Sequence, residues 1–186
     1  ATYGVVVKIE RDGSAEVISR GHRNPQGLSF DAETNTLWLS EHGPKGGDEL
    51  NRIVAGRDYG WPDVTYGGPY GGRSQPDTSW DFGRWFGKSH GEFEEPVLTW
   101  LPAIAASQLL VYQGAMFDEW RGDVLLGSFK GSIHRIRMTE DRVLFDERID
   151  IGTRPRDLIQ LPDGSLMITT DYDEIMRISA KSFESE

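Results

Sequence analysis

The chain of 186 residues contains no cysteine. This absence excludes disulfide bonds, thiolate metal sites and a cysteine nucleophile, although it does not fix the cellular compartment. Long hydrophobic runs are also missing: no segment approaches the roughly 18 apolar residues that a membrane-spanning helix needs, and no signal peptide is evident. Because the first residue is alanine and not methionine, we expect that a leader or a longer preceding segment has been removed.

Basic residues are scarce relative to acidic ones. Twenty lysines and arginines stand against thirty aspartates and glutamates, which gives a formal net charge of -10. Such a charge repels phosphate backbones and anionic membrane surfaces, so neither nucleic acid nor a membrane is expected as a partner. The 37% hydrophobic and 27% charged content is typical of a globular protein. A chain of this length usually forms one unit with a real core, and we expect a single domain over residues 1–186.

The chain repeats a pattern of short alternating strands. Three similar segments, at residues 49–53, 132–136 and 174–178, each alternate apolar and polar residues as a short strand does. Each follows a pair of further strand-like segments, and a partial copy opens the chain; these segments are residues 6–9 and 15–18, 27–31 and 37–40, 109–112 and 123–127, and 157–161 and 166–169. Short strands at blade-like spacing, with no helical pattern between them, predict an all-β fold of the β-propeller type.

The repeats account for about three blades, whereas propellers close with about four to eight. Both ends of the chain are expected to cut across a blade. The chain is therefore predicted to be a partial propeller or half of a two-chain ring, completed by missing N-terminal blades or by a second copy. An ordinary β-sandwich is the alternative, although its strands need no internal repeat. A glycine- and aromatic-rich insertion at about residues 62–95 is expected to form a wall over a pocket, with a capping structure as the alternative.

Residues 21–62 concentrate polar side chains in short loops and are expected to form one complete blade. Turn geometry explains the glycines and prolines of this stretch, but not the clustering of Arg23, Asp48 and Glu49. Loops beside strands are common places for functional sites. The informative motifs are Arg23-Asn24-Pro25-Gln26-Gly27, Glu41-His42-Gly43-Pro44, Asp48-Glu49 and Tyr59-Gly60-Trp61-Pro62.

Taken in this order and spacing, these motifs resemble the soluble pyrroloquinoline quinone (PQQ)-dependent sugar dehydrogenases, particularly the aldose sugar dehydrogenase branch. The resemblance covers essentially the whole chain but only the C-terminal half of the family's six-bladed propeller. It implies oxidation of an aldose sugar to its lactone, with hydride passing to the quinone, and a periplasmic or secreted location. The cofactor carries the chemistry, and the protein supplies orientation, charge and a base.

The resemblance also implies site residues. It places Arg23 and Asn24 beside the quinone, a lysine-bearing segment against the cofactor and two arginines on its carboxylates. The cofactor-binding candidates are Arg23, Asn24, Tyr70, Ser128, Phe129, Lys130, Arg154, Pro155 and Arg156. Each of the cations has the alternative of being an ordinary solvated side chain.

Calcium is the second implied cofactor, because it takes carboxylate and carbonyl oxygens. One ion is expected at carbonyls of Gly43 and Pro44, and another at the carboxylate of Glu49 with the carbonyl of Tyr59. His42 has two open interpretations, either a loop histidine with its hydrogen bonds satisfied or a direct role in the site.

The family's general base is a histidine in an earlier blade, whose position precedes Ala1. None of His22, His42, His90 and His134 lies in that motif, so this chain alone is expected to be inactive, with no catalytic residue of its own. Two other functions remain open: a noncatalytic propeller fragment that self-associates through its blade edges, or a calcium-dependent propeller lactonase. The lactonase would ligate its metal with central acidic and amide side chains and has no use for Lys130.

Overall fold

The computed structural model describes residues 4–68, 90–140 and 142–180, and it is built from antiparallel strands. Within these residues the only helical element is η1, a single 3₁₀ turn at Asp118–Trp120. No helix in this part of the chain is long and apolar enough to cross a membrane. The strands form four sheets in chain order: β1 (Val5–Ile9) and β2 (Ala15–Arg20); β3 (Pro25–Asp31), β4 (Thr36–Glu41), β5 (Asp48–Ile53) and β6 (Leu98–Trp100); β7 (Ala106–Val111), β8 (Val124–Ser128), β9 (Ser132–Met138) and β10 (Val143–Asp150); β11 (Pro155–Gln160), β12 (Leu166–Thr170) and β13 (Ile175–Ile178).

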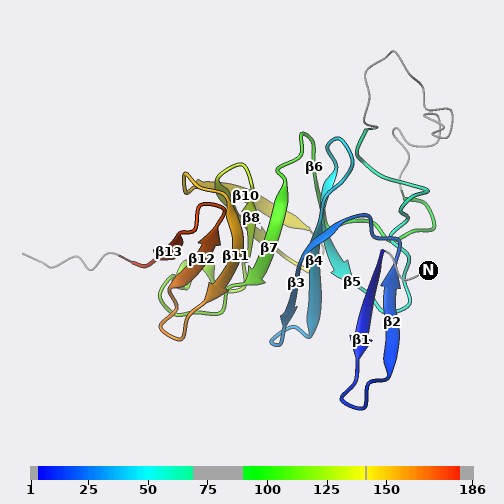
Figure 1. The fold of residues 1–186 in the computed structure, drawn as a ribbon, viewed down its shortest axis with the longest axis horizontal. Helices are drawn as coiled ribbons and strands as arrows, with labels where there is room; N and C mark the ends of the chain where they lie inside the picture. The colour runs from blue at the N-terminus through cyan, green and yellow to red at the C-terminus, as the bar shows by residue number, and fades with distance from the viewer. Residues whose placement is uncertain (1–3, 69–89, 141, 181–186) are drawn as a thin grey trace, which may run out of the picture.

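The sheets follow one another as the blades of a partial propeller. Strands within each sheet pair antiparallel with their chain neighbours, and the four twisted sheets lie side by side in an arc (Figure 1). The first strands of successive blades contact one another, β3 with β7 and β7 with β11. Two complete four-stranded blades are thus flanked by a two-stranded and a three-stranded sheet. This confirms the predicted all-β propeller of about three blades.

The expectation that residues 21–62 complete a blade was wrong. They supply three strands, and the fourth, β6, comes from beyond the insertion and pairs with β5 through Asp48 opposite Trp100. A strand of three residues carries too little alternation to be recognised in a sequence. The insertion therefore connects the third and fourth strands of one blade.

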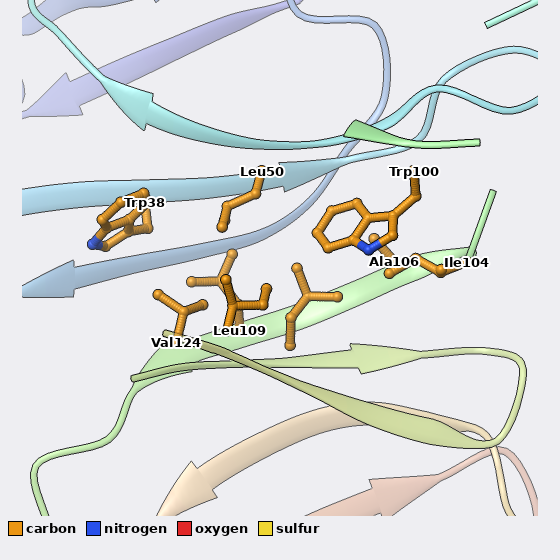
Figure 2. Close-up of a cluster of buried hydrophobic side chains, with 9 residues drawn as sticks. Trp38, Leu50, Trp100, Ile104, Ala106, Leu109 and Val124 are labelled. Atoms are coloured by element: carbon orange, nitrogen blue, oxygen red, sulfur yellow. The ribbon is translucent and has the colours of Figure 1, made fainter. Parts of the chain in front are cut away.

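The core lies between adjacent blades. Leu50 on β5 and Leu126 on β8 are fully buried, and Figure 2 shows Leu50 and Trp100 facing Leu109 across the space between two sheets. A second cluster, which includes Tyr112 and Ile168, fills the space between the next two sheets. Burying each such side chain contributes about 1.5–3 kcal/mol. Alternation along each strand directs one apolar face toward the neighbouring blade and so sets the blade spacing.

A polar contact also joins the two complete blades. The indole Nε1 of Trp100 donates to Asp146 Oδ2 at 2.7 Å, and His134 Nδ1 lies 2.8 Å from Asp146 Oδ1. His134 is buried and its ring meets the Trp100 ring edge-on. His134 therefore serves blade packing.

Candidate functional site

Most of the predicted site residues that the structure describes lie in loops or near strand ends at one end of the blades, called the mouth below. β3 begins opposite the end of β4, where Pro25 pairs with Glu41. In the next blade β7 begins opposite the end of β8, and β11 begins opposite the end of β12. Because the strands alternate in direction, the loops at residues 21–24, 42–47, 128–131 and 152–154 all reach the mouth.

Phe129 contacts the two predicted arginines at the start of β11 and the ring of His42 from another blade. The guanidinium carbons of Arg154 and Arg156 lie 5.1 and 4.4 Å from the centroid of the Phe129 ring. A cation over an aromatic face at this range contributes about 0.5–1 kcal/mol at an exposed site. On another side the His42 ring meets Phe129 edge-on at 5.9 Å. Phe129 thus brings the two arginines next to the loop that follows β4.

Asp171, directly after β12, was not anticipated from the sequence. Its carboxylate bridges the two arginines, with Arg154 Nε 3.1 Å from Oδ2 and Arg156 Nε bonded to Oδ1. Both contacts use Nε, and the Nη groups of these arginines make no hydrogen bond to any residue that the structure describes. Among the described residues nothing occupies the guanidinium edges that could bind a carboxylate in a fork.

Ser128 fixes the turn that carries Lys130. The Ser128 hydroxyl donates to the carbonyl of Ile104 at 2.6 Å and accepts the backbone N–H of Lys130 at 3.1 Å. Ser128 is fully buried, whereas Lys130 is exposed. Pro155 is also buried, at the start of β11. Ser128 and Pro155 shape the mouth, and Lys130 and the arginines project from it.

Arg23 binds the backbone of the loop after β4. Its Nη1 donates to the carbonyls of His42 at 3.0 Å and Gly43 at 2.9 Å. Its guanidinium carbon lies 5.2 Å from the centroid of a Trp61 ring, and its backbone N–H donates to Glu41 Oε2 at 2.7 Å. The side chain is therefore held by two carbonyls and an aromatic face.

His42 links two blades through its ring. Its Nε2 lies 2.6 Å from the carbonyl oxygen of Ala106, so Nε2 carries the proton and donates. The other nitrogen, Nδ1, then faces the side-chain amide of Asn24 at 3.5 Å as an acceptor. These contacts favour a loop histidine with its hydrogen bonds satisfied.

A depression beside Arg23 brings together the predicted calcium ligands. It encloses roughly 230 Å³, part of it open to solvent, and is lined by Gly21, Arg23, Glu41, His42, Gly43, Glu49, Tyr59, Trp61, Val64 and Thr65. Glu49, Tyr59 and Gly43 thus share one depression, and Pro44 is buried next to it.

Glu49 faces a second carboxylate that sequence reasoning missed. The strand register places Glu41 on β4 directly opposite Glu49 on β5, and both side chains are buried, at 4% and 8% exposed. Directly opposed like charges destabilise a sheet. Asn51 is interposed, with its amide donating to Glu41 Oε1 at 3.0 Å and to Glu49 Oε2 at 3.3 Å. Burial, followed by the charge of Glu41, raises the pKa of Glu49 to about 8, against the opposing effect of the Asn51 hydrogen bond.

His22 completes this buried network. Its Nδ1 lies 2.9 Å from Glu41 Oε1 and its Nε2 lies 2.8 Å from the Ser19 hydroxyl. Its ring stacks on Tyr59 with 4.5 Å between centroids. His22 therefore holds the Tyr59 segment against the carboxylate pair, a role that only the pairing of distant segments reveals.

Asp48 had no assigned role in the sequence, and the structure supplies one. Its carboxylate accepts three backbone N–H groups, from Gly43 at 3.2 Å, Ala105 at 2.6 Å and Ala106 at 3.2 Å. It is 2% exposed. Asp48 thus ties the loop after β4 to the start of β7 in the next blade.

Some predicted features lie outside the described residues. Tyr70 and residues 69–89 of the insertion are among them, so the predicted cofactor contact of Tyr70 and the predicted wall remain expectations. In residues 4–68, 90–140 and 142–180 no three His, Cys, Asp or Glu side chains are grouped to hold a metal ion. A calcium ion at Glu49 would therefore need carbonyl oxygens as well, as the sequence predicted.

Comparison with known proteins gives these features a family. The family model described as glucose/sorbosone dehydrogenase matches residues 5–177. The chain is 35% identical over 178 residues to the aldose sugar dehydrogenase YliI of Escherichia coli strain K12, covering 93% of this chain and 46% of that protein. It is 27% identical over 232 residues to quinoprotein glucose dehydrogenase B of Acinetobacter calcoaceticus, covering 91% and 48%.

The solved structures agree. A crystal structure of a glucose dehydrogenase is similar to this fold with a TM-score of 0.81 at 31% identity, covering 97% of this chain and 55% of that one. The chain spans about half the length of the curated relatives that it matches. The family match extends over nearly all of the described strands, and the chain therefore belongs to the glucose/sorbosone dehydrogenase family.

Proposed function

We propose that this chain forms the C-terminal half of a PQQ- and calcium-dependent aldose dehydrogenase and carries much of its cofactor site. The observation that carries the proposal is the convergence of Arg23, Lys130, Arg154 and Arg156 on one mouth of an acidic protein. The name of one relative, quinoprotein glucose dehydrogenase, supports a quinone in the family. The sugar substrate, a periplasmic or secreted location and completion of the ring by further blades or a second copy belong to the same proposal.

The charges at the mouth suit a polyanionic ligand. Among the described residues, Arg154 and Arg156 pair with one carboxylate, that of Asp171, and Lys130 adds a further positive charge at the mouth. PQQ is a planar tricarboxylate, and when bound it supplies the two-electron acceptor for sugar oxidation. The arginines would bind its carboxylates through their Nη groups, and Phe129 keeps both guanidiniums in place. Asn24, whose side-chain amide lies 3.5 Å from His42 Nδ1, would bind the quinone edge.

The Glu49 position fits a calcium ion. The ionised form of this buried carboxylate, which lies opposite a second one, is destabilised enough to raise its pKa to about 8. Calcium would supply a stabilising positive charge, with Glu49 and the Tyr59 carbonyl as ligands from this chain. The Gly43 position does not fit an ion as it stands, because Arg23 binds the Gly43 carbonyl.

Removal of the sugar hydroxyl proton needs a base. None of His22, His42, His90 and His134 lies in the motif where the resemblance places the family's base. We therefore assign the base to the part of the family fold that lies outside this chain, and we expect the isolated chain to bind the quinone without oxidising sugar.

Replacing Arg154 with alanine should weaken quinone binding about tenfold, because one fork to a carboxylate is lost. PQQ is titrated into the full chain with calcium present, and binding is followed by quinone absorbance. Arg148→Ala is the matched control, because Arg148 lies on the outer strand β10 and pairs only with Asp150 among the described residues. Equal affinities for the wild type and Arg154→Ala would contradict the assignment of the arginines to the cofactor.

A further inference from the structure

Two backbone carbonyls in the depression converge on one positive charge. The carbonyl oxygens of His42 and Gly43 lie 3.0 and 2.9 Å from the same nitrogen, Nη1 of Arg23. Carbonyl oxygens are ligands that calcium prefers, and a pair directed at one point forms part of a cation site. Here the point is taken by a guanidinium. The segment that was expected to ligate an ion therefore already holds a cation from its own chain.

Arg23 is held firmly in this position. Its backbone N–H is anchored to Glu41 Oε2 at 2.7 Å, and the Trp61 ring lies 5.2 Å from the guanidinium carbon. Gly43 is buried, and its N–H is fixed by Asp48. Both the carbonyl and the arginine are thus fixed by separate contacts, which sets their geometry before any ligand arrives.

We infer that Arg23 is the resident cation of the His42 and Gly43 carbonyls, so that a metal ion and the Arg23 guanidinium exclude each other there. Two positive charges sharing one carbonyl oxygen would lie only a few ångströms apart and repel strongly. The depression therefore has two cation positions of different kinds, one at Glu49 that is open to calcium and one that Arg23 fills. The inference rests on the proposed function only for the identity of the competing ion.

The inference also assigns Arg23 a second task. If it is released from the carbonyls, its guanidinium can turn toward a bound anion, and a metal ion can take the carbonyls. While Arg23 remains bound to the His42 and Gly43 carbonyls, an anion at the mouth faces a guanidinium at the position where the resemblance predicted calcium. Arg23 and the metal are alternatives for one position.

The test uses terbium(III), an oxygen-seeking ion whose emission is sensitised by a nearby tryptophan, here Trp61. Glu49→Gln is the background, because it removes the carboxylate of the other position. Adding Arg23→Met to this background should lower the half-saturating terbium concentration about tenfold, and calcium should reverse the emission. Arg23→Gln, which is also neutral, should behave in the same way.

Two controls separate the inference from a general charge effect. Arg23→Lys keeps the positive charge and should stay within twofold of the Glu49→Gln background. Arg154→Met removes one charge from the same mouth without touching the carbonyls and should also stay within twofold. The inference is overturned if both neutral Arg23 variants, with wild-type circular dichroism, match the background, or if Arg154→Met shows the same gain.

The assay contains no quinone. Loss of PQQ binding in the titration above would therefore overturn the proposed function and leave this result standing. Conversely, unchanged terbium binding would overturn the role of Arg23 at the carbonyls and leave the cofactor proposal standing.

Discussion

Replacing Glu49 with glutamine should stabilise the calcium-free protein at pH 8.5 by about 5 kcal/mol, because each pKa unit of the shift is worth about 1.4 kcal/mol. The pKa of Glu49 is about 8 in the folded chain against an ordinary value of 4.5. Because the folded pKa is the higher one, the folded state binds more protons between these values, and stability falls as pH rises from 4.5 to 8. Glutamine stays neutral and removes this loss.

The measurement is urea unfolding in EDTA, followed by tryptophan fluorescence at a series of pH values. The difference between the wild type and Glu49→Gln should be near zero at pH 4, grow through the window and level off above pH 8. Calcium should restore the stability of the wild type at pH 8.5 but not change the variant. Glu16→Gln, on the exposed face of β2, is the control. If the free energy of unfolding depended on pH in the same way for the wild type and Glu49→Gln, the ionisation of Glu49 would not destabilise the fold.

Replacing Asp48 with alanine should destabilise the protein by about 3 kcal/mol or more, because each unsatisfied buried donor costs about 1–3 kcal/mol. The carboxylate accepts backbone N–H groups of Gly43, Ala105 and Ala106 in a site that is 2% exposed. Water cannot easily replace it there. The loop after β4 would also lose its tie to β7, so Arg23 would lose the fixed carbonyl of Gly43.

The free energy of unfolding from urea titration at pH 7 checks this effect. Asp157→Ala is the control, because Asp157 is exposed on β11 and surface changes usually stay within about 0.5 kcal/mol. Asp48→Asn should fall between the two, since its amide keeps one acceptor oxygen. If Asp48→Ala and Asp157→Ala were equally stable, the three hydrogen bonds would have no net effect on folding.

The success of the sequence in predicting the blades has a local cause. Strand alternation and turn residues act over a few residues, so segments such as 132–136 and 174–178 could be recognised without a structure. β6 was missed because a three-residue strand has almost no alternation and follows a long insertion. The cations at the mouth were found because a resemblance of motifs connected loops from different blades.

The contacts that organise the site were beyond such local signals. Asp171, just after β12, bridges Arg154 and Arg156 at the start of the neighbouring strand β11. Glu41 opposes Glu49 only because of the register between β4 and β5. A shift of that register by one residue would place the two carboxylates on opposite faces. Neither contact has a pattern of its own in the sequence.

By itself the sequence determined the all-β repeat, the exclusion of thiol chemistry, and the motifs that match the sugar dehydrogenases, because composition and short periodicity are properties of the chain. Only the tertiary structure decided which charges meet. It paired Glu49 with Glu41, and it placed Arg23 on the carbonyl of Gly43. Electrostatic interactions depend on distance and burial, and both are set by packing between blades.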